Sequence, residues 1–122
     1  MSRRRLALLV EDCLVNQKLL THMLEKEGFE VVLAVNGQEA VDKFKQEPFD
    51  VVIMDVQMPV MDGLEATRLI RQHEKDSGHR TPIVAVTAGM DRNSCIGAGM
   101  NDYLAKPVRA PDFHEVLERH CA

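Results

Sequence analysis

The chain has 122 residues, enough for one domain with its own core, and its 45% hydrophobic and 28% charged residues are typical of a globular protein. The formal net charge of −4 provides no overall positive field for holding nucleic acid or an anionic membrane surface directly. Three cysteines without paired spacing do not resemble a disulfide framework or a zinc site, and they favour a reducing, cytoplasmic location. The first apolar run stops at Glu11, so it is too short for a signal peptide or a membrane span.

The apolar residues recur in short runs separated by stretches with helical spacing. Each run is rich in Val, Ile and Leu and has the length of a strand buried on both faces. In chain order, we expect a strand at 6–10, a helix at 15–24, a strand at 31–35, a helix at 40–44, a strand at 51–54, a helix at 64–70, a strand at 83–86, a helix at 91–100, a weaker strand at 103–105 and a helix at 113–120. This alternation predicts one compact α/β domain over residues 1–122, with a parallel sheet.

The fourth expected helix carries two glycines, Gly97 and Gly99. A glycine inside a helix costs up to about 1 kcal/mol relative to alanine. We therefore expect this helix to be the least stable of the five.

Polar residues follow the strands, and ligands of open parallel sheets bind beyond the carboxyl ends of the strands. In chain order these residues are Glu11 and Asp12, Asn36, Asp55, Thr87 and Lys106. Three carboxylates, a hydroxyl and an ammonium are therefore expected on one rim. Each residue alone has an ordinary explanation, as a helix cap or a solvated side chain, but their joint placement favours a site.

Three crowded carboxylates raise one another's pKa unless a positive charge lies among them. A divalent cation fits, and the all-oxygen donor set indicates Mg²⁺, because Zn²⁺ prefers His or Cys ligands. The ammonium of Lys106 and the hydroxyl of Thr87 suit the oxygens of a phosphoryl group. Asp55, at the end of a central strand, is the best-placed nucleophile for in-line phosphoryl transfer.

Four segments of the chain match a known pattern in order and spacing. They are LLVEDCLVNQ (8–17), VVIMDVQMPVMDG (51–63), PIVAVTAG (82–89) and AGMNDYLAKPV (98–108). Over residues 6–120 the chain thereby resembles the receiver domain of two-component response regulators, most of all the receivers of hybrid sensor histidine kinases. The resemblance implies a flavodoxin-like (βα)5 fold with strand order 2-1-3-4-5. It also implies a phosphorylation-dependent signalling switch, which is not a turnover enzyme.

The resemblance implies roles for individual residues. Asp55 is the expected phosphoacceptor and also a metal ligand. Asp12 is expected to bind Mg²⁺ directly, Glu11 to bind it through water, and Gln57 to contribute its backbone carbonyl. Gln57 and Gly89 occupy positions that vary in the family and tune the lifetime of the phosphoryl group.

The resemblance further assigns Thr87 as the switch hydroxyl, Tyr103 as the aromatic switch residue and Lys106 as the family's lysine. The Lys106–Pro107 bond falls where the family has a cis peptide, an isomer that X–Pro bonds permit. The surface formed by the fourth helix, fifth strand and fifth helix is expected to change most on phosphorylation. In such a switch, the negative charge of the phosphoryl group on Asp55 attracts Thr87 and Lys106 and thereby shifts the conformation of this surface.

The expected partner is a histidine kinase or a histidine phosphotransfer domain, with a downstream protein or an attached output domain as a second partner. Residues 13–15 and the first helix are expected to form the docking surface for the phosphodonor. The sequence leaves open whether the chain is a free-standing receiver or part of a hybrid kinase, and in which direction the phosphoryl group passes.

The sequence has two rival interpretations, an enzyme or a binding module, and the second takes two forms. A phosphohydrolase of the haloacid dehalogenase type needs a carboxylate two residues after the nucleophile, where this chain has Gln57. A flavodoxin-like nucleotide binder needs a glycine-rich phosphate cradle after the first strand, which is absent. A degenerate receiver would be expected to lack the acidic pair, Asp55 or Lys106, and all of these are present.

Overall fold

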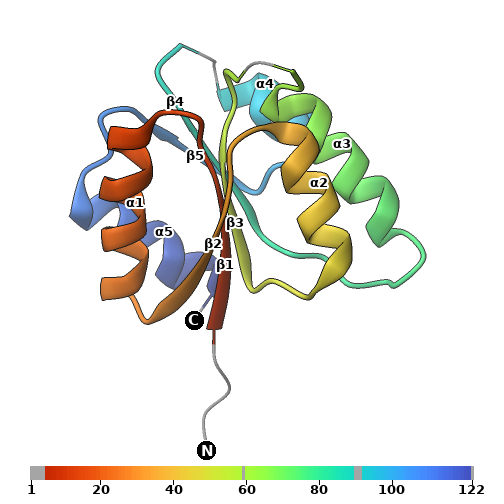
Figure 1. The fold of residues 1–122 in the computed structure, drawn as a ribbon, viewed down its shortest axis with the longest axis horizontal. Coiled ribbons are helices and arrows are strands. Elements are labelled where there is room, and N and C mark those ends of the chain that lie inside the picture. The colour runs from red at the N-terminus through yellow and green to blue at the C-terminus, as the bar shows by residue number, and fades with distance from the viewer. Residues whose placement is uncertain (1–4, 59, 90–91, 122) are drawn as a thin grey trace, which may run out of the picture.

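The computed structural model describes residues 5–58, 60–89 and 92–121 and contains one five-stranded sheet between two layers of helices (Figure 1). The strand order is β2-β1-β3-β4-β5 and every neighbouring pair is parallel. The elements are β1 (Arg5–Val10), α1 (Leu14–Lys26), β2 (Phe29–Ala34), α2 (Gly37–Gln46), β3 (Val51–Asp55), α3 (Gly63–Glu74), β4 (Ile83–Thr87), α4 (Arg92–Gly97), β5 (Asp102–Ala105) and α5 (Ala110–Cys121). The predicted fold class and strand order are therefore confirmed.

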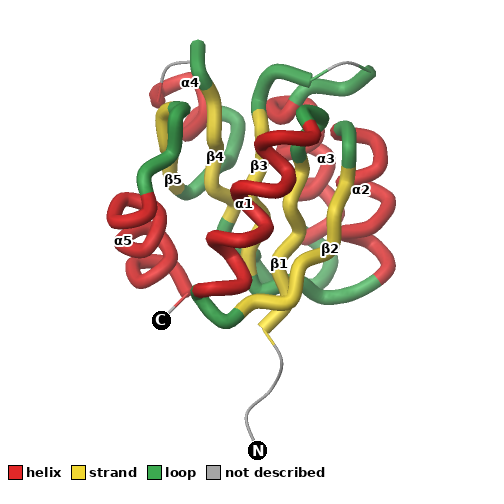
Figure 2. The backbone as a smooth tube through the Cα atoms, turned by 60° about the vertical axis from the view of Figure 1, so that its left-hand side comes forward, coloured by secondary structure: helices red, strands yellow, loops and turns green. Residues whose placement is uncertain are grey.

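Helices cover both faces of the sheet (Figure 2), and each face has its own hydrophobic core. Alternate residues of a strand point to opposite faces, so Val52 and Met54 of β3 pack beneath α2, α3 and α4, whereas Val51 and Ile53 pack beneath α1 and α5. The central strands β1, β3 and β4 thus supply side chains to both cores. Burial on both faces explains why these strands are continuous apolar runs.

The second strand differs from its prediction. It begins at Phe29 rather than at residue 31 and ends at Ala34. Its exposed and half-buried residues 30–33 also contradict the expectation of a strand buried on both faces. The reason is its place at the edge of the sheet, where it pairs with β1 on one side and leaves its other side unpaired.

The fourth helix is shorter than predicted, with six described residues that end at Gly97. The residue at 91, where the helix was expected to begin, lies outside the described residues. Gly99 has a φ of +111°, a left-handed conformation that ends a helix and that glycine adopts without strain. The two glycines therefore bring the helix to an early end.

Short local contacts hold the loops on the upper side of the sheet. The side chains of Asn36 and Asp62 cap α2 and α3 by accepting from the backbone N–H groups of Glu39 at 2.8 Å and Glu65 at 2.9 Å. A Cβ at Gly63 would lie 2.6 Å from the carbonyl oxygen of Asp55. Only glycine lets α3 begin this close to the end of β3.

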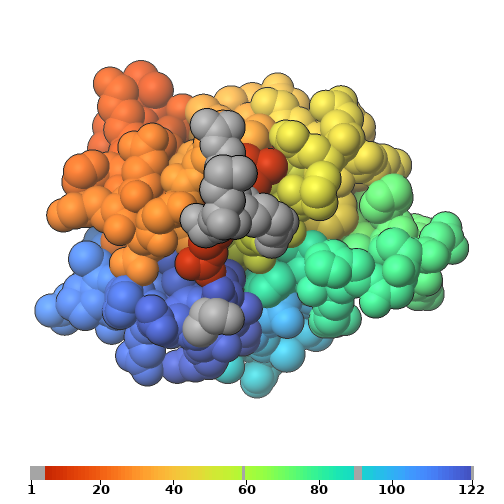
Figure 3. Space-filling view, turned by 90° about the horizontal axis from the view of Figure 1, so that it is seen from below, coloured from red at the N-terminus to blue at the C-terminus, as the bar shows by residue number. Residues whose placement is uncertain are grey.

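The start of β1 and the end of α5 meet at the lower end of the molecule, which Figure 3 shows from below. There the guanidinium of Arg5 donates to the carbonyl oxygen of Cys121 and lies 4.6 Å from the ring centre of Phe29. Among the described helices, none is long and apolar enough to cross a lipid bilayer.

Candidate functional site

The carboxyl ends of β1 and β3 place three acidic side chains together. One oxygen from each of Glu11, Asp12 and Asp55 lies within 4.8 Å of the other two. Because β1 and β3 are adjacent, with Val10 opposite Met54, the residues that follow them lie on the same rim. Glu11 and Asp55 are buried, whereas Asp12 is exposed.

The backbone around Glu11 fixes its carboxylate. One oxygen accepts from the N–H of Cys13 at 3.1 Å and the other from the ammonium of Lys106 at 3.1 Å. The side-chain amide of Gln17, on the first turns of α1, donates to the carbonyl oxygen of Glu11 at 2.8 Å. Glu11 is completely buried, so these donors replace the water that an exposed carboxylate would bind.

Asp55 is only 5% exposed. One carboxylate oxygen accepts from the N–H of Gln57 at 3.2 Å, and the other accepts from the ammonium of Lys106 at 3.3 Å. Burial and the nearby charge of Glu11 raise the pKa of Asp55 to about 6, against the lowering effect of Lys106. Burial and the charge of Glu11 thus make the ionised form of Asp55 costly at this rim.

Lys106 is the cation that Glu11 and Asp55 share. Burial lowers the pKa of its ammonium, but the hydrogen bond to Glu11 and the charges of both carboxylates outweigh burial and raise it. The bond between Lys106 and Pro107 is cis, as the resemblance implied.

The donor set suits magnesium. Three carboxylates that approach one another from two adjacent strands offer only oxygen, and one of them, Asp12, is open to solvent. Mg²⁺ takes one or two carboxylates and keeps positions for water and phosphate oxygens, which this partly open cluster would allow. No histidine belongs to the cluster.

Thr87 and Tyr103 belong to β4 and β5, and the carbonyl oxygen of Thr87 accepts from the backbone N–H of Lys106 at 3.0 Å. Thr87 ends β4 and is completely buried, and its hydroxyl oxygen lies 3.4 Å from the N–H of Gly89. Among the described residues, no hydrogen bond joins Thr87 to Asp55. Tyr103 is half-buried against the core beneath α4. The structure therefore brings Glu11, Asp55 and Lys106 into direct contact and joins Thr87 to Lys106 through the backbone, whereas Tyr103 packs against the core.

Gln57 and Gly89 lie beside each other at the mouth of the site. A Cβ at Gly89 would lie 3.1 Å from the side-chain nitrogen of Gln57. The two positions that were expected to tune the lifetime of a phosphoryl group therefore face each other.

An apolar surface borders the acidic cluster on the side of α1. Leu14 is 63% exposed and Val15 is 74% exposed, as expected for residues 13–15. Leu19 extends this surface into a groove of about 260 Å³ between α1 and the loop that follows β5. The groove reaches Lys106, so the apolar surface and the acidic site are continuous.

Sequence reasoning did not find Gln17, which anchors the backbone at Glu11. Its amide lies on α1 and bonds to a carbonyl oxygen six residues earlier. The only signal in the sequence was a polar residue at a position of the helix that the apolar spacing places near the sheet.

The comparison with protein families gives one match. The response regulator receiver domain matches residues 7–118, which is nearly the whole chain.

Curated relatives include sensor histidine kinases. The osmosensing histidine protein kinase SLN1 of Saccharomyces cerevisiae is 44% identical over 124 residues, covering 94% of this chain and 10% of that protein. The hybrid signal transduction histidine kinase G of Dictyostelium discoideum is 47% identical over 118 residues, covering 93% of this chain and 3% of that protein. The expected likeness to hybrid kinases is confirmed, and the chain spans a tenth or less of these two relatives.

Solved structures agree in fold. The receiver domain of the sensor histidine kinase PA1611 from Pseudomonas aeruginosa, with a magnesium ion in its active-site cleft, has a TM-score of 0.88 and 42% identity, covering 98% of both chains. The receiver domain of Ssk1 from S. cerevisiae, crystallised with the phosphotransfer protein Ypd1, has a TM-score of 0.90 and 35% identity, covering 99% of this chain and 91% of that one. The chain belongs to the response regulator receiver domain family, the signalling switches of two-component phosphorelays.

Proposed function

We propose that Asp55 accepts a phosphoryl group from a phosphohistidine on a partner protein. An oxygen of Asp55 forms the new bond to phosphorus, the phosphorus–nitrogen bond of the donor breaks, and the histidine keeps the electron pair. The observation that carries this proposal is the buried carboxylate of Asp55 at the end of a central strand, in contact with Lys106 and next to Glu11.

We propose that the acidic cluster holds Mg²⁺, which when bound neutralises negative charge on the transferred group. Asp12, Asp55 and the backbone carbonyl of Gln57 would be direct ligands, and Glu11 would act through water. The crowding of Glu11 with Asp55 supports this assignment, since a bound cation would offset the charge repulsion that, together with burial, raises the pKa of Asp55. The magnesium ion in the receiver of PA1611 supports the same choice of metal.

The ammonium of Lys106, which donates to Glu11 and Asp55, would then also donate to an oxygen of the phosphoryl group. It is 3.3 Å from Asp55 in this structure, close enough to follow a group attached to that carboxylate. The hydroxyl of Thr87 would donate to another phosphoryl oxygen. Thr87 has no hydrogen bond to Asp55 among the described contacts, so this step requires a movement at the end of β4.

The movement of Thr87 would change the surface of α4, β5 and α5, with Tyr103 following it. The element that would respond is α4, which has six described residues and ends in Gly97. A short helix with few packing contacts is shifted by a small free energy. The domain would act as a switch, and its only chemistry would be its own phosphorylation and dephosphorylation.

The proposed phosphodonor is a histidine kinase or a histidine phosphotransfer domain that docks on α1 beside the site. Leu14 and Val15 offer it apolar surface next to the acidic cluster. The complex of the similar Ssk1 receiver with Ypd1 supports a phosphotransfer protein as partner. We propose that residues 1–122 form one receiver domain with a cytoplasmic location, which three free cysteines favour.

Intact-mass spectrometry after incubation with Mg²⁺ and acetyl phosphate tests the acceptor. We expect one added phosphoryl group that requires Mg²⁺ and is missing in Asp55→Asn. An adduct of the same size on Asp55→Asn would move the acceptor to another residue. No adduct on the native chain, together with no binding of beryllofluoride, would reject the phosphoacceptor function.

Hydrogen exchange with and without beryllofluoride and Mg²⁺ tests the switch. We expect altered protection in residues 92–106 and constant protection in β1 and β2. Unaltered protection throughout 92–106 in a protein saturated with beryllofluoride would reject a switch built on α4 and β5.

Leu14→Arg tests the docking surface. We expect phosphotransfer from a protein donor to slow by about tenfold or more, since one lost apolar contact and one buried charge each cost more than 1 kcal/mol. Phosphorylation by acetyl phosphate should stay unchanged. Gln46→Arg, at an exposed residue at the end of α2, is the control and should leave both reactions intact. Equal slowing with both donors in Leu14→Arg would contradict the docking role.

A further inference from the structure

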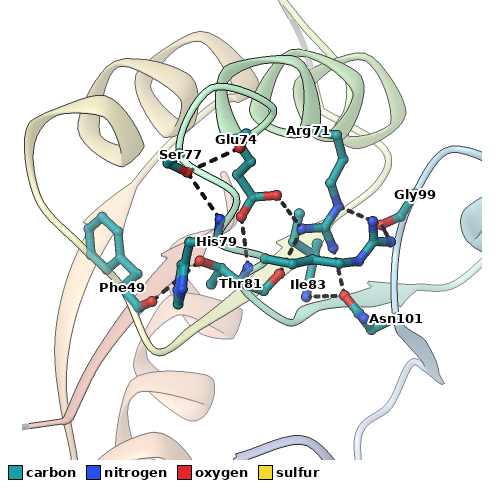
Figure 4. Close-up of polar contacts among 10 residues, drawn as sticks. Phe49, Arg71, Glu74, Ser77, His79, Thr81, Ile83, Gly99 and Asn101 are labelled. Carbon is teal, nitrogen blue, oxygen red and sulfur yellow. Dashed lines mark hydrogen bonds and ion pairs between the residues drawn. The ribbon is translucent and has the colours of Figure 1, made fainter.

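Arg71 ties the lower half of α3 to the loop between α4 and β5 (Figure 4). Its guanidinium donates to the carbonyl oxygens of Gly99 and Thr81, both at 2.8 Å, and to the side-chain oxygen of Asn101 at 2.6 Å. It also pairs with the buried carboxylate of Glu74 at 2.7 Å. Four of the five N–H donors of Arg71 are engaged in this way, so its guanidinium acts as a fixed part of the structure.

The Arg71 network forms the floor of a groove of about 450 Å³ between α3 and α4. Small residues on the α4 side leave the groove free of side chains. A Cβ at Gly97 would have open space around it, and Gly99 packs closely against Arg71. The groove is lined by Arg68, Arg71, Gln72, Lys75, Arg80, Gly97, Ala98 and Gly99. Four of these eight residues are cationic and none is acidic.

The cations on the rim are poorly neutralised. Arg68 is 60% exposed and reaches Glu65 only at 3.6 Å. Lys75 and Arg80 are exposed, and in the described part of the chain no carboxylate is paired with either of them. Within the described residues, the guanidinium of Arg80 donates to the carbonyl oxygen of Gly99, at 3.3 Å. Three positive charges therefore border one groove in a chain whose net charge is −4.

The electrostatics of Arg71 agree with this geometry. Burial lowers the pKa of its guanidinium, and the positive charge of Arg80 lowers it further, against the raising effect of Glu74. Like charges crowd this groove, and a bound anion would relieve their repulsion.

We propose that the α3–α4 groove is a docking site for a short acidic segment of a partner protein. Exposed guanidinium groups bind carboxylates in a bidentate manner, and the ammonium of Lys75 adds a third contact. The small residues Gly97, Ala98 and Gly99 at the bottom of the groove leave room for an extended peptide. A long nucleic acid fits less well, because the whole chain is acidic, with a formal net charge of −4.

The groove lies on the face of the sheet opposite to α1. Residues of α3 and α4 pack in one core, and residues of α1 in the other. An acidic segment in the groove would therefore leave the proposed phosphodonor surface at Leu14 free. Because Gly97 ends α4, the segment would also contact the helix proposed as the switch element. Docking itself does not depend on phosphorylation of Asp55.

A peptide with six consecutive glutamates, titrated into the ¹⁵N-labelled chain at low salt, tests the groove. We expect the largest NMR shifts at the amides of Arg68, Lys75, Arg80 and 97–99. Lys75→Gln/Arg80→Gln should weaken binding about 5- to 10-fold, which is the sum expected for two exposed ion pairs. A peptide of six glutamines should produce no shifts.

The matched control is Lys26→Gln/Lys45→Gln, which removes the same charge from exposed positions at the ends of α1 and α2. It should weaken binding less than twofold. Equal weakening by the two double variants, shifts spread over all basic residues, or absence of binding at low salt would each overturn the proposal. Tighter binding of a duplex DNA than of the peptide, centred on the same amides, would assign the groove to phosphate and overturn it as well.

Discussion

Asp55 and Asp102 are both buried carboxylates of one sheet, yet their charges are stabilised to different degrees. Burial raises the pKa of each. Asp55 shares the ammonium of Lys106 with Glu11, and its pKa rises to about 6. The pKa of Asp102 falls to about 2, because hydrogen bonds outweigh burial; its donors are His120, the N–H of Tyr103, Arg119 and Arg92. At Asp55 the charge of Glu11 adds to the effect of burial, whereas at Asp102 four hydrogen-bond donors oppose it.

The raised pKa of Asp55 makes its charge a cost to the folded state. A carboxylate whose pKa is higher in the folded than in the unfolded chain destabilises the fold as the pH rises from 3.8 to about 6. In a buffer with a chelator at pH 7, Asp55→Asn should therefore be more stable than the native chain by about 1–3 kcal/mol. Urea denaturation at pH 4 and pH 7 measures the difference, which should shrink at pH 4.

Magnesium provides the control for this experiment. Added Mg²⁺ should stabilise the native chain at pH 7 and stabilise Asp55→Asn much less, because the variant lacks one ligand and one charge. A variant that is no more stable than the native chain at pH 7 would contradict the electrostatic account of Asp55.

Asp102 should respond to pH in the opposite direction. Its depressed pKa gives stability that is present above pH 3.8 and is lost as the pH falls toward 2. Asp102→Asn should cost about 1–2 kcal/mol at pH 7, the usual value for hydrogen bonds to a charged group, since Arg119 at 2.7 Å and His120 at 2.9 Å lose their anionic acceptor. Thermal unfolding of both proteins between pH 2 and pH 7 should converge at the acid end. A constant difference across this range would mean that the loss is steric.

Gly97 and Gly99 affect helix α4 for different physical reasons, so alanine should have opposite effects at the two positions. A Cβ at Gly97 would contact nothing within 4 Å, and its φ is not in the left-handed region, so Gly97→Ala should stabilise the fold by about 0.5–1 kcal/mol. Gly99 has a φ of +111°, and a Cβ there would lie 3.0 Å from the Cγ of Arg71. Gly99→Ala should therefore destabilise the fold by about 1 kcal/mol or more. Chemical denaturation of both variants measures the two signs.

The same pair of variants tests α4 as a mobile element. In Gly97→Ala, amide exchange within residues 92–97 should slow, because alanine lowers the free energy of the helical state. If exchange there is unchanged while global stability rises, the glycine acts on the unfolded chain and not on the helix.

At the scale of the whole molecule, the pattern of apolar runs was enough to predict all ten elements and the single sheet. The runs at 51–54 and 83–86 are continuous because both faces of β3 and β4 are buried, and this signal is strong. The position of the candidate site could be predicted in the same way, because the carboxyl ends of parallel strands lie at one edge of the sheet. At β2 the prediction failed, because an edge strand is half-exposed and its first residues, Phe29 and Glu30, do not extend an apolar run.

Long-range polar contacts left no comparable signal. Arg71 bonds to Gly99 and Asn101, which are 28 and 30 residues away, and Arg119 bonds to Asp102 from the last helix. Periodicity describes which side chains face a core, but it does not pair a cation on one element with an acceptor on another. The α3–α4 groove therefore became visible only in the folded structure.

The two cores should unfold as one unit, because β1, β3 and β4 contribute side chains to both of them. Loss of either helical layer exposes one face of the same three strands, so neither core is stable alone. The chain has one tyrosine, Tyr103 on β5, and no tryptophan, so tyrosine fluorescence reports the α4 side of the sheet while far-UV circular dichroism reports all helices. In urea we expect both signals to change at one midpoint, with an unfolding free energy of about 5–15 kcal/mol. An earlier fluorescence midpoint would show that α4 and β5 separate from the remaining sheet, and the domain would then contain two cooperative units.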